Sequence, residues 1–372
     1  MRTRPIRTLL SCAIVGALSL GFIASPATAK TTARTSPATD QVTFLADRQL
    51  PDGAIRAFPD FIEPYFANIA SLGLLAEGSP RARTVVLRWM GWYITHLNNS
   101  DVSGLKGSIY DFNYDQATGV ETPTNDYDSV DSYASTALNL AYRAYVSKDA
   151  RLKKFVVKNI ATYDEVAALL INSPANGGVR DANELTIAKP TYAVNYTMDN
   201  AEVVSGLRDY AHLKRLMHAT DAGRYQKKAE ATRKAMISLL WDTSTKTWDW
   251  ALDSSSDPRA TFYPEGVAQI WPTLWGVVAP RSAIAKTSWS TFVKAWPNWS
   301  SDQVPDAYPW TSMAIVARQM GDARGANRLV SRIRANYAPQ WQLPRSCGAS
   351  ECGRWYSAEA GWMLLALKHQ AP

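Results

Sequence analysis

The sequence is poor in the residues that build metal sites and serine or cysteine active sites. Its 372 residues include three Cys and four His, and the His are scattered along segments with helical periodicity. A zinc site needs several such ligands at close spacing, and a serine triad needs a His beside the nucleophile. No Gly-x-Ser-x-Gly elbow, phosphate-binding loop or His-Glu-x-x-His motif is present. We therefore expect no metal and no cofactor.

The sequence also lacks an apolar run of the roughly 20 residues that a membrane-spanning helix needs. Its clearest apolar run, residues 9–23, is shorter and follows three Arg within the first seven residues. Ala27-Thr28-Ala29 completes the layout of a secretory signal peptide, so we expect cleavage after Ala29 and a secreted, extracellular protein. A membrane anchor is the alternative. Cys12 weakly resembles a lipoprotein cysteine, but most of the apolar run follows it, and we interpret it as discarded.

No run of charge of one sign is present. The formal net charge of +7 falls to +4 once the three Arg of the signal segment are removed. Lys and Arg are interspersed with acids, as at residues 227–230, and they form no basic stripe of the kind that binds nucleic acid. We expect solvated helix faces and no nucleic-acid partner.

Cys347 and Cys352 are the cysteines that remain after export. In an oxidising compartment, two cysteines at this spacing predict a disulfide that closes a loop. A metal site is the alternative, but it would need additional Cys or His ligands.

Helical periodicity recurs after a polar segment, residues 30–38, that we predict to be a disordered tail. We interpret residues 39–372 as one domain. Gly, Pro, Asn and Asp mark breaks between twelve predicted helices. These are expected at 39–50, 64–78, 80–98, 129–147, 149–172, 197–219, 221–241, 264–278, 284–295, 308–320, 322–337 and 356–370.

Three connections between these helices have the pattern of extended chain: residues 108–123, 177–194 and 245–262. Short hairpins there would gather at one rim of a helical ring. The second, fourth, sixth and tenth predicted helices have apolar, small or aromatic faces, whereas their partners carry more Lys, Glu and Asp. This contrast favours an inner and an outer ring. An open solenoid is the alternative, but no repeat of 34 to 47 residues is visible.

Acids stand beside aromatic residues near the starts of predicted inner helices. These places are residues 61–68, 125–133, 196–202, 263–266 and 306–310.

An ordered set of motifs is similar to that of a known superfamily. The chain contains Pro-Asp-Gly at 51–53, Pro-Tyr-Phe-Ala-Asn at 64–68, Asp-Tyr-Asp-Ser-Val-Asp-Ser-Tyr-Ala at 126–134, Asp-Asn-Ala-Glu at 199–202 and Tyr-Pro-Glu-Gly-Val-Ala-Gln-Ile-Trp-Pro at 263–272. Over about residues 39–370 it resembles the six-hairpin glycosidases. That resemblance implies an all-α (α/α)6 toroid of twelve helices and a glycoside hydrolase. The same toroid also serves polysaccharide lyases and epimerases, so the reaction has to be inferred from the site.

Glycoside hydrolysis needs a carboxylic acid to protonate the leaving oxygen and a carboxylate to activate water or attack the sugar. The resemblance makes Asp131 and Asp199 the leading pair, and Glu63, Glu265 and Asp128 are further candidates at comparable positions. Helix capping is the alternative for Asp128 and Asp199, and stabilisation of the helix dipole is the alternative for Glu63 and Glu265.

Fourteen Trp and seventeen Tyr supply rings on which sugars can stack. Those adjoining the acid motifs, together with two Asn that could bind hydroxyl groups, are the predicted substrate-binding residues. Glu202 is expected to form an ion pair, with Arg208 or another barrel residue, more readily than to bind substrate. The predicted substrate-binding set is Tyr65, Asn68, Tyr127, Tyr133, Asn200, Tyr263, Trp271, Trp310 and Trp355.

The expected partner is a carbohydrate polymer or oligosaccharide, bound by a monomer. Two other functions remain open at this point. A polysaccharide lyase would use a Tyr or His base and a group that neutralises a uronate, and a non-catalytic toroid would only bind glycan or another partner.

Overall fold

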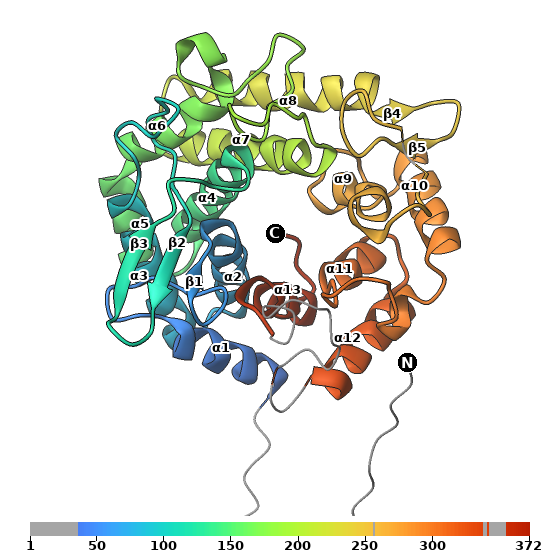
Figure 1. Cartoon of the computed structure of the whole chain (residues 1–372), viewed down its shortest axis with the longest axis horizontal. Coiled ribbons are helices and arrows are strands. Elements are labelled where there is room, and N and C mark those ends of the chain that lie inside the picture. The colour runs from blue at the N-terminus through green and yellow to red at the C-terminus, as the bar shows by residue number, and fades with distance from the viewer. Residues whose placement is uncertain (1–35, 256, 338–340, 342–354) are drawn as a thin grey trace, which may run out of the picture. The chain divides into compact units, whose positions relative to one another are not determined.

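Two concentric rings of helices make up the unit Ser36–Pro372 (Figure 1). The computed structural model describes residues 36–255, 257–337, 341 and 355–372. The α-helices are α1 Pro37–Arg48, α2 Pro64–Glu77, α3 Pro80–Thr95, α4 Val130–Val146, α5 Ala150–Lys158, α6 Ile160–Ile171, α7 Thr197–Leu216, α8 Ala222–Leu239, α9 Trp271–Leu274, α10 Ala283–Ala295, α11 Ser312–Gln319, α12 Ala323–Tyr337 and α13 Ser357–Lys368.

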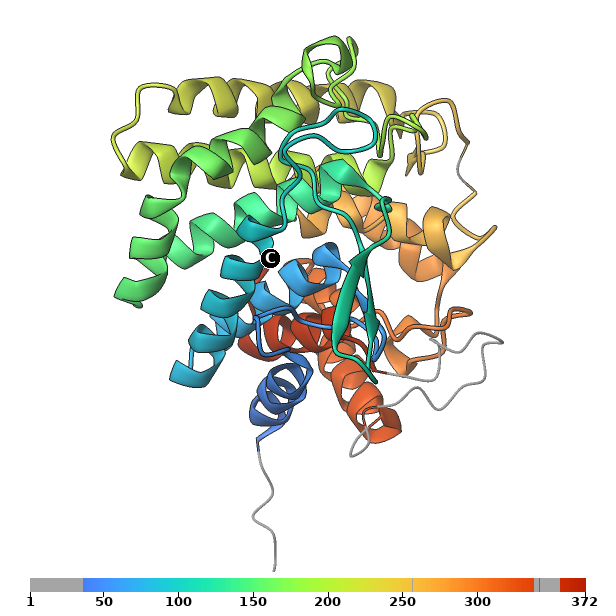
Figure 2. The same ribbon diagram turned by 60° about the vertical axis from the view of Figure 1, so that its left-hand side comes forward.

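The inner helices contact one another in a closed cycle, in the order α2, α4, α7, α9, α11 and α13, with α13 returning to α2. The other helices surround them (Figures 1 and 2). This closure confirms the predicted all-α toroid, because the first and last helices of an open solenoid would not contact each other. Within the described ranges, no helix is both long enough and apolar enough to cross a bilayer.

Small residues allow the inner helices to approach closely. A Cβ added to Gly73 of α2 would lie 2.4 Å from the carbonyl oxygen of Gly361 in α13. One added to Gly206 of α7 would lie 2.5 Å from the carbonyl oxygen of Ser135 in α4. Both separations are shorter than real Cβ contacts, so larger side chains at these positions would push the ring apart.

Short strands lie in the connections that precede inner helices. They are β1 Phe61–Ile62, β2 Phe112–Asp115, β3 Val120–Pro123, β4 Trp241–Asp242 and β5 Thr247–Trp248. The predicted hairpin at 108–123 is confirmed as β2 and β3, and β1 pairs with its β2 edge. The 177–194 connection forms isolated bridges instead of strands. The extended segment predicted at 245–262 pairs through β5 with the earlier β4, and Ala251 forms an isolated bridge with Tyr196.

Several predicted boundaries were wrong. The segment 149–172 is two helices, because the chain leaves helical geometry at Asn159 between α5 and α6. The segment 264–278 keeps only a π-helical turn, Phe262–Gly266, and the short α9, because Pro264 and Pro272 lack the N–H group that a longer helix needs. Helix α1 begins at Pro37, inside the predicted tail.

Some of the outer helices begin with a side-chain cap, which the inner helices lack. Ser36, Ser79 and Ser282 cap α1, α3 and α10, each accepting a backbone N–H bond through its hydroxyl. At the starts of the inner helices α2, α4, α7 and α13, no side chain of the N-cap residue makes such a bond. The polar side chains at these inner starts are therefore available for other contacts.

Candidate active site

A cavity of about 390 Å³ lies where the inner helices begin. Its volume is in the range that binds small molecules. The lining combines acids with aromatic rings, and its described part includes no Lys, Arg or His. It consists of Glu63, Tyr65, Phe66, Asp128, Ser129, Ser132, Tyr133, Met198, Asp199, Glu202, Tyr263, Val267, Trp271, Asp306, Ala307, Tyr308, Trp310, Tyr356, Ala358, Glu359 and Trp362.

Glu202, in the second turn of α7, is held by two neighbours in the cavity wall. The Tyr65 hydroxyl donates to its Oε1 at 2.7 Å, and the Trp271 indole N–H donates to the same oxygen at 3.0 Å. Only 2% of the residue is exposed. Burial raises the pKa of the Glu202 carboxyl to about 7, although the donated hydrogen bonds favour its ionised form.

Glu359, in the first turn of α13, is held in a similar way by one residue. Its Oε2 accepts a bond from the Thr311 backbone N–H at 3.0 Å and another from the Thr311 hydroxyl at 2.5 Å. Burial raises the pKa of the Glu359 carboxyl to about 7. Near neutral pH, each of these carboxyls can thus give or accept a proton.

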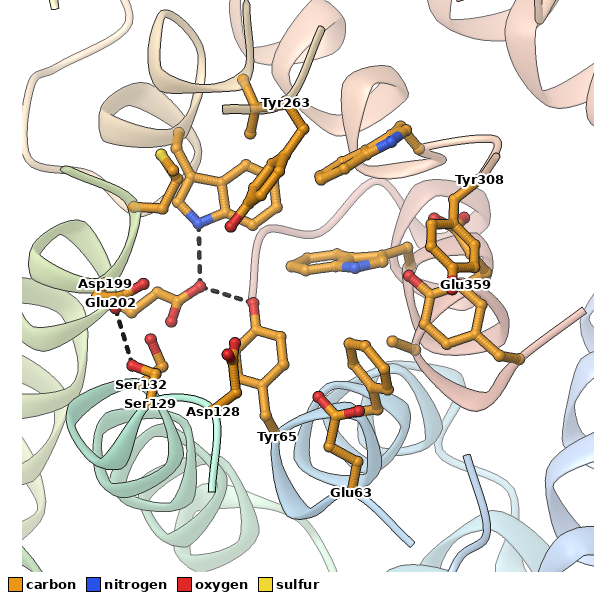
Figure 3. Close-up of a pocket in the computed structure, with 18 of the residues that line it drawn as sticks. Glu63, Tyr65, Asp128, Ser129, Ser132, Asp199, Glu202, Tyr263, Tyr308 and Glu359 are labelled. Atoms are coloured by element: carbon orange, nitrogen blue, oxygen red, sulfur yellow. Dashed lines mark hydrogen bonds between the residues drawn. The ribbon is translucent and has the colours of Figure 1, made fainter. Parts of the chain in front are cut away.

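The two carboxyls face the cavity from opposite walls. In the closed cycle α7 and α13 are separated by two helices on either side, so they stand across the ring from each other. Figure 3 shows Glu202 on one side, bonded to Tyr65, and Glu359 on the other, behind Tyr308. A sugar ring held by the aromatic residues between them would have a carboxyl group on each side.

A serine joins the two acids that the sequence made the leading pair. The Ser129 hydroxyl lies 2.6 Å from Asp131 Oδ1 and 2.8 Å from Asp199 Oδ2. It can donate to only one of them at a time, so the pair is satisfied best when Asp199 is protonated and donates to Ser129. Burial and the charges of Asp131 and Glu202 raise the Asp199 pKa accordingly.

A third group of acids lies near the start of α2. The Tyr133 hydroxyl donates to Asp111 at 2.8 Å. Burial, followed by the charges of Asp111 and Asp128, raises the pKa of Glu63 well above its usual range. Burial also raises the Asp111 pKa, to about 7. These shifts favour the neutral, protonated forms of both acids.

Most of the sequence-predicted site residues line the cavity. Those it brings together are Glu63, Tyr65, Asp128, Tyr133, Asp199, Tyr263, Trp271 and Trp310. Capping does not explain Asp128 and Asp199, because neither of them is the N-cap residue of α4 or α7.

Asp131 and Glu265, two predicted catalytic residues, lie outside the lining. Asp131 is fully buried behind Ser129 and also accepts a bond from the Thr186 hydroxyl at 2.6 Å. Burial raises its pKa to about 6. Glu265 instead accepts a bond from the hydroxyl of Thr261 in its own turn. Asp131 can therefore position Ser129 and Asp199 but does not face a ligand.

Asn68 and Asn200, predicted to bind hydroxyl groups, are fully buried and hold the fold together. Asn68 accepts a bond from the Trp89 indole at 3.0 Å. Asn200 accepts the Thr186 N–H at 2.8 Å and donates to the Thr186 carbonyl at 3.0 Å. Neither amide reaches the cavity.

Tyr127 and Trp355 also point away from the cavity. The Tyr127 hydroxyl donates to Asp101 at 2.8 Å, and the Trp355 indole donates to Gln41 at 2.9 Å. Both residues are buried. Their positions next to acid motifs gave no information about the direction of their side chains.

Several cavity residues were missed by the sequence prediction. Glu202 was expected to pair with a cation, but Arg208 donates to the carbonyls of Gly276 and Trp275 instead. Glu359 stands beside Tyr356 at the start of the last inner helix, which is the same acid-and-aromatic signal that marked the other helices. Tyr356 and Trp362 were also missed, and Asp306 and Tyr308 were noted only as part of the segment 306–310.

No cluster of three or more potential metal ligands was found among the residues that the structure describes. The predicted disulfide between Cys347 and Cys352 and the signal segment lie outside the described residues.

The raised pKa values predict that stability decreases as pH increases. Glu202 and Glu359 titrate near 7 in the folded chain, against 4.5 in their ordinary state. Each therefore contributes its full stabilisation below about pH 4.5 and loses it as pH rises towards 7, a loss of roughly 3 kcal/mol per group. We expect the Tm to be several degrees higher at pH 5 than at pH 8. Calorimetry of the wild type and the Glu202→Gln/Glu359→Gln double variant checks this, and an equal pH dependence in both would contradict it.

The sequence matches no protein-family model and no curated protein. The fold is similar to that of a glycosidase solved with glucose, at a TM-score of 0.63 and 15% identity, over 89% of this chain and 95% of the other. It is also similar to an alpha-mannosidase from Streptococcus pneumoniae solved with alpha-1,6-mannobiose, at 0.59 and 12%, over 89% and 93%. A rhamnosidase from Klebsiella oxytoca with bound rhamnose matches at 0.58 and 12%, over 89% and 64%. The chain thus has the toroidal fold of these glycosidases.

Proposed function

We propose that this protein is an exported glycoside hydrolase of the six-hairpin superfamily, which cleaves a glycosidic bond in the cavity of the toroid. The observation that carries the proposal is the pair Glu202 and Glu359, buried on opposite walls of an aromatic cavity with pKa values near 7. Hydrolysis needs two carboxyls on either side of the scissile bond, one protonated and one ionised. The glycosidases that share the fold support this choice.

The proposed pair replaces the one that the sequence suggested. Glu202 and Glu359 both line the cavity, whereas Asp131 lies behind Ser129. In this scheme one carboxyl of the pair protonates the leaving oxygen, and the other takes a proton from water or attacks the sugar directly. Asp131 and Ser129 then act as positioning residues that set the protonation of Asp199.

The lining of the cavity gives less support to a polysaccharide lyase. A lyase must neutralise the uronate next to the proton it removes, but the described lining supplies six carboxyls and no cationic side chain. Those that are ionised would repel a uronate, and a protonated carboxyl supplies no positive charge to neutralise it. The cavity therefore favours a neutral sugar or one that carries an amino group.

Product release from neutral, amino-sugar and uronate polysaccharides tests the proposal. We expect the wild type to release reducing ends without the absorbance of unsaturated products, and both Glu202→Gln and Glu359→Gln to lose that release. Glu230→Gln, on the outer helix α8, is the matched control and should behave as the wild type. Unsaturated products would show a lyase, and no release from any polysaccharide would favour a binding protein.

A further inference from the structure

Three aromatic residues lie next to the cavity but outside its lining: Tyr192, Tyr196 and Trp250. Their rings form a continuous row, with centroids 6.3 Å apart between Tyr192 and Tyr196 and 5.5 Å apart between Tyr196 and Trp250. Tyr192 is 48% exposed, and the other two are partly exposed. We call this row the aromatic platform. Tyr196 and Trp250 pack partly against the core, and Tyr192 extends the row towards solvent, so the row presents aromatic surface to a ligand.

The backbone holds the aromatic platform in place. Tyr196 forms an antiparallel bridge with Ala251, which follows Trp250 in the chain. The N–H of Thr197 donates to the Trp250 carbonyl at 2.9 Å, and the N–H of Leu252 donates to the Asn195 carbonyl at 3.1 Å. The two hydroxyls of Tyr192 and Tyr196 lie 3.2 Å apart. A preformed row of this kind binds a flat ligand without first having to become ordered.

The platform adjoins the cavity along α7. Tyr196 is the N-cap residue of α7, and the cavity acids Asp199 and Glu202 follow within two turns of that helix. Tyr263 is half exposed and stacks on the cavity residue Trp310 at 5.6 Å. Aromatic side chains are therefore present both in the cavity wall and at the start of α7, where the platform lies.

We propose that the aromatic platform of Tyr192, Tyr196 and Trp250 is an outer sugar-binding subsite, which holds the leaving-group side of an oligosaccharide whose adjoining sugar occupies the cavity. Sugar rings present C–H faces that pack on aromatic rings, while the hydroxyls of Tyr192 and Tyr196 can bond their edges. The leaving-group role rests on the proposed hydrolase, whereas binding of sugar does not.

The position of the platform also orients the reaction. It adjoins the start of α7, so the bond between the two bound sugars lies nearer Glu202 than Glu359, which is across the ring. Glu202 then protonates the leaving oxygen as the bond to the cavity sugar breaks, and a water molecule that loses its proton to the opposite carboxyl supplies the new hydroxyl. The preferred substrate is a chain of sugars and not a single sugar with a small leaving group.

Binding and kinetics of platform variants test this subsite. Native electrophoresis through gels that contain yeast mannan, dextran, soluble starch or chitosan measures binding without catalysis. We expect at least one polymer to retard the wild type. Trp250→Ala and Tyr192→Ala should weaken that retardation, with a dissociation constant about tenfold higher. Tyr145→Ala is the matched control, because that partly exposed tyrosine lies near the end of α4 opposite the cavity.

Kinetics separate this proposal from the proposed hydrolase. On oligosaccharides of the retarding polymer, Trp250→Ala should raise KM about tenfold more than it does on the 4-nitrophenyl glycoside of the same sugar. If neither the wild type nor any variant releases sugar but Trp250→Ala still loses retardation, the proposed hydrolase is wrong and the proposed subsite is supported. If the wild type cleaves the polymer and Trp250→Ala matches Tyr145→Ala in both measurements, the subsite is overturned. Absence of retardation by any polymer also overturns it.

Discussion

Glu202→Gln is expected to lower kcat on an oligosaccharide roughly a thousandfold, within the range that general acid catalysis contributes. Glutamine keeps an oxygen that can accept the bonds from Tyr65 and Trp271, so the cavity wall should retain its shape. What it cannot do is donate a proton to the leaving oxygen. The loss should therefore fall on kcat with little change in KM, as measured by initial rates on the polymer that the wild type cleaves best.

The leaving group distinguishes a lost acid from a lost fold. A 2,4-dinitrophenyl glycoside of the same sugar has a leaving oxygen that departs without protonation, so Glu202→Gln should retain most of the wild-type rate on it. The alkaline limb of the pH profile should disappear in this variant, because that limb reports the acid losing its proton. An equal loss on both substrates would contradict the assignment of Glu202 as the acid.

Glu359→Gln is expected to cause a loss of similar size that an activated leaving group does not restore. Its amide oxygen can still accept the Thr311 bonds, but the amide cannot remove a proton from water or attack the sugar. The wild type should show a bell-shaped kcat profile centred near pH 7, since both carboxyls titrate there. Glu359→Gln should lose the acidic limb, because the ionised base is no longer present. Retention of that limb would assign the base to another cavity acid, such as Asp199.

The local sequence pattern predicted the two rings of helices but not the extent of each helix. Alternation between small or aromatic faces and charged faces predicted inner and outer helices, because an inner helix is packed on all sides. It could not predict the break at Asn159, where apolar periodicity continues through both α5 and α6. Nor did it show how far the two prolines would shorten the helix expected at 264–278.

The direction of side chains separated the predicted site residues from the observed ones. Tyr65 and Asn68 are three residues apart on α2, but Tyr65 reaches Glu202 while Asn68 bonds the outer-ring Trp89. Both neighbour the same acid motif, so proximity in sequence could not distinguish them. Glu202 was expected to pair with Arg208 or another barrel residue, yet Arg208 lies toward α9 and bonds backbone carbonyls.

The sequence by itself determined the class of fold, the end of the ring at which acids and aromatic residues collect, and the poverty in metal ligands. The class of fold follows from the count of helices, the contrast between their faces and the resemblance to the six-hairpin glycosidases, and the other two follow from local composition. Only the tertiary structure decided that Glu202 faces Glu359 and that Asp131 is screened by Ser129. The physical reason is that pKa and access depend on burial and on neighbours from helices far apart in the chain, and ring closure is what brings those helices together.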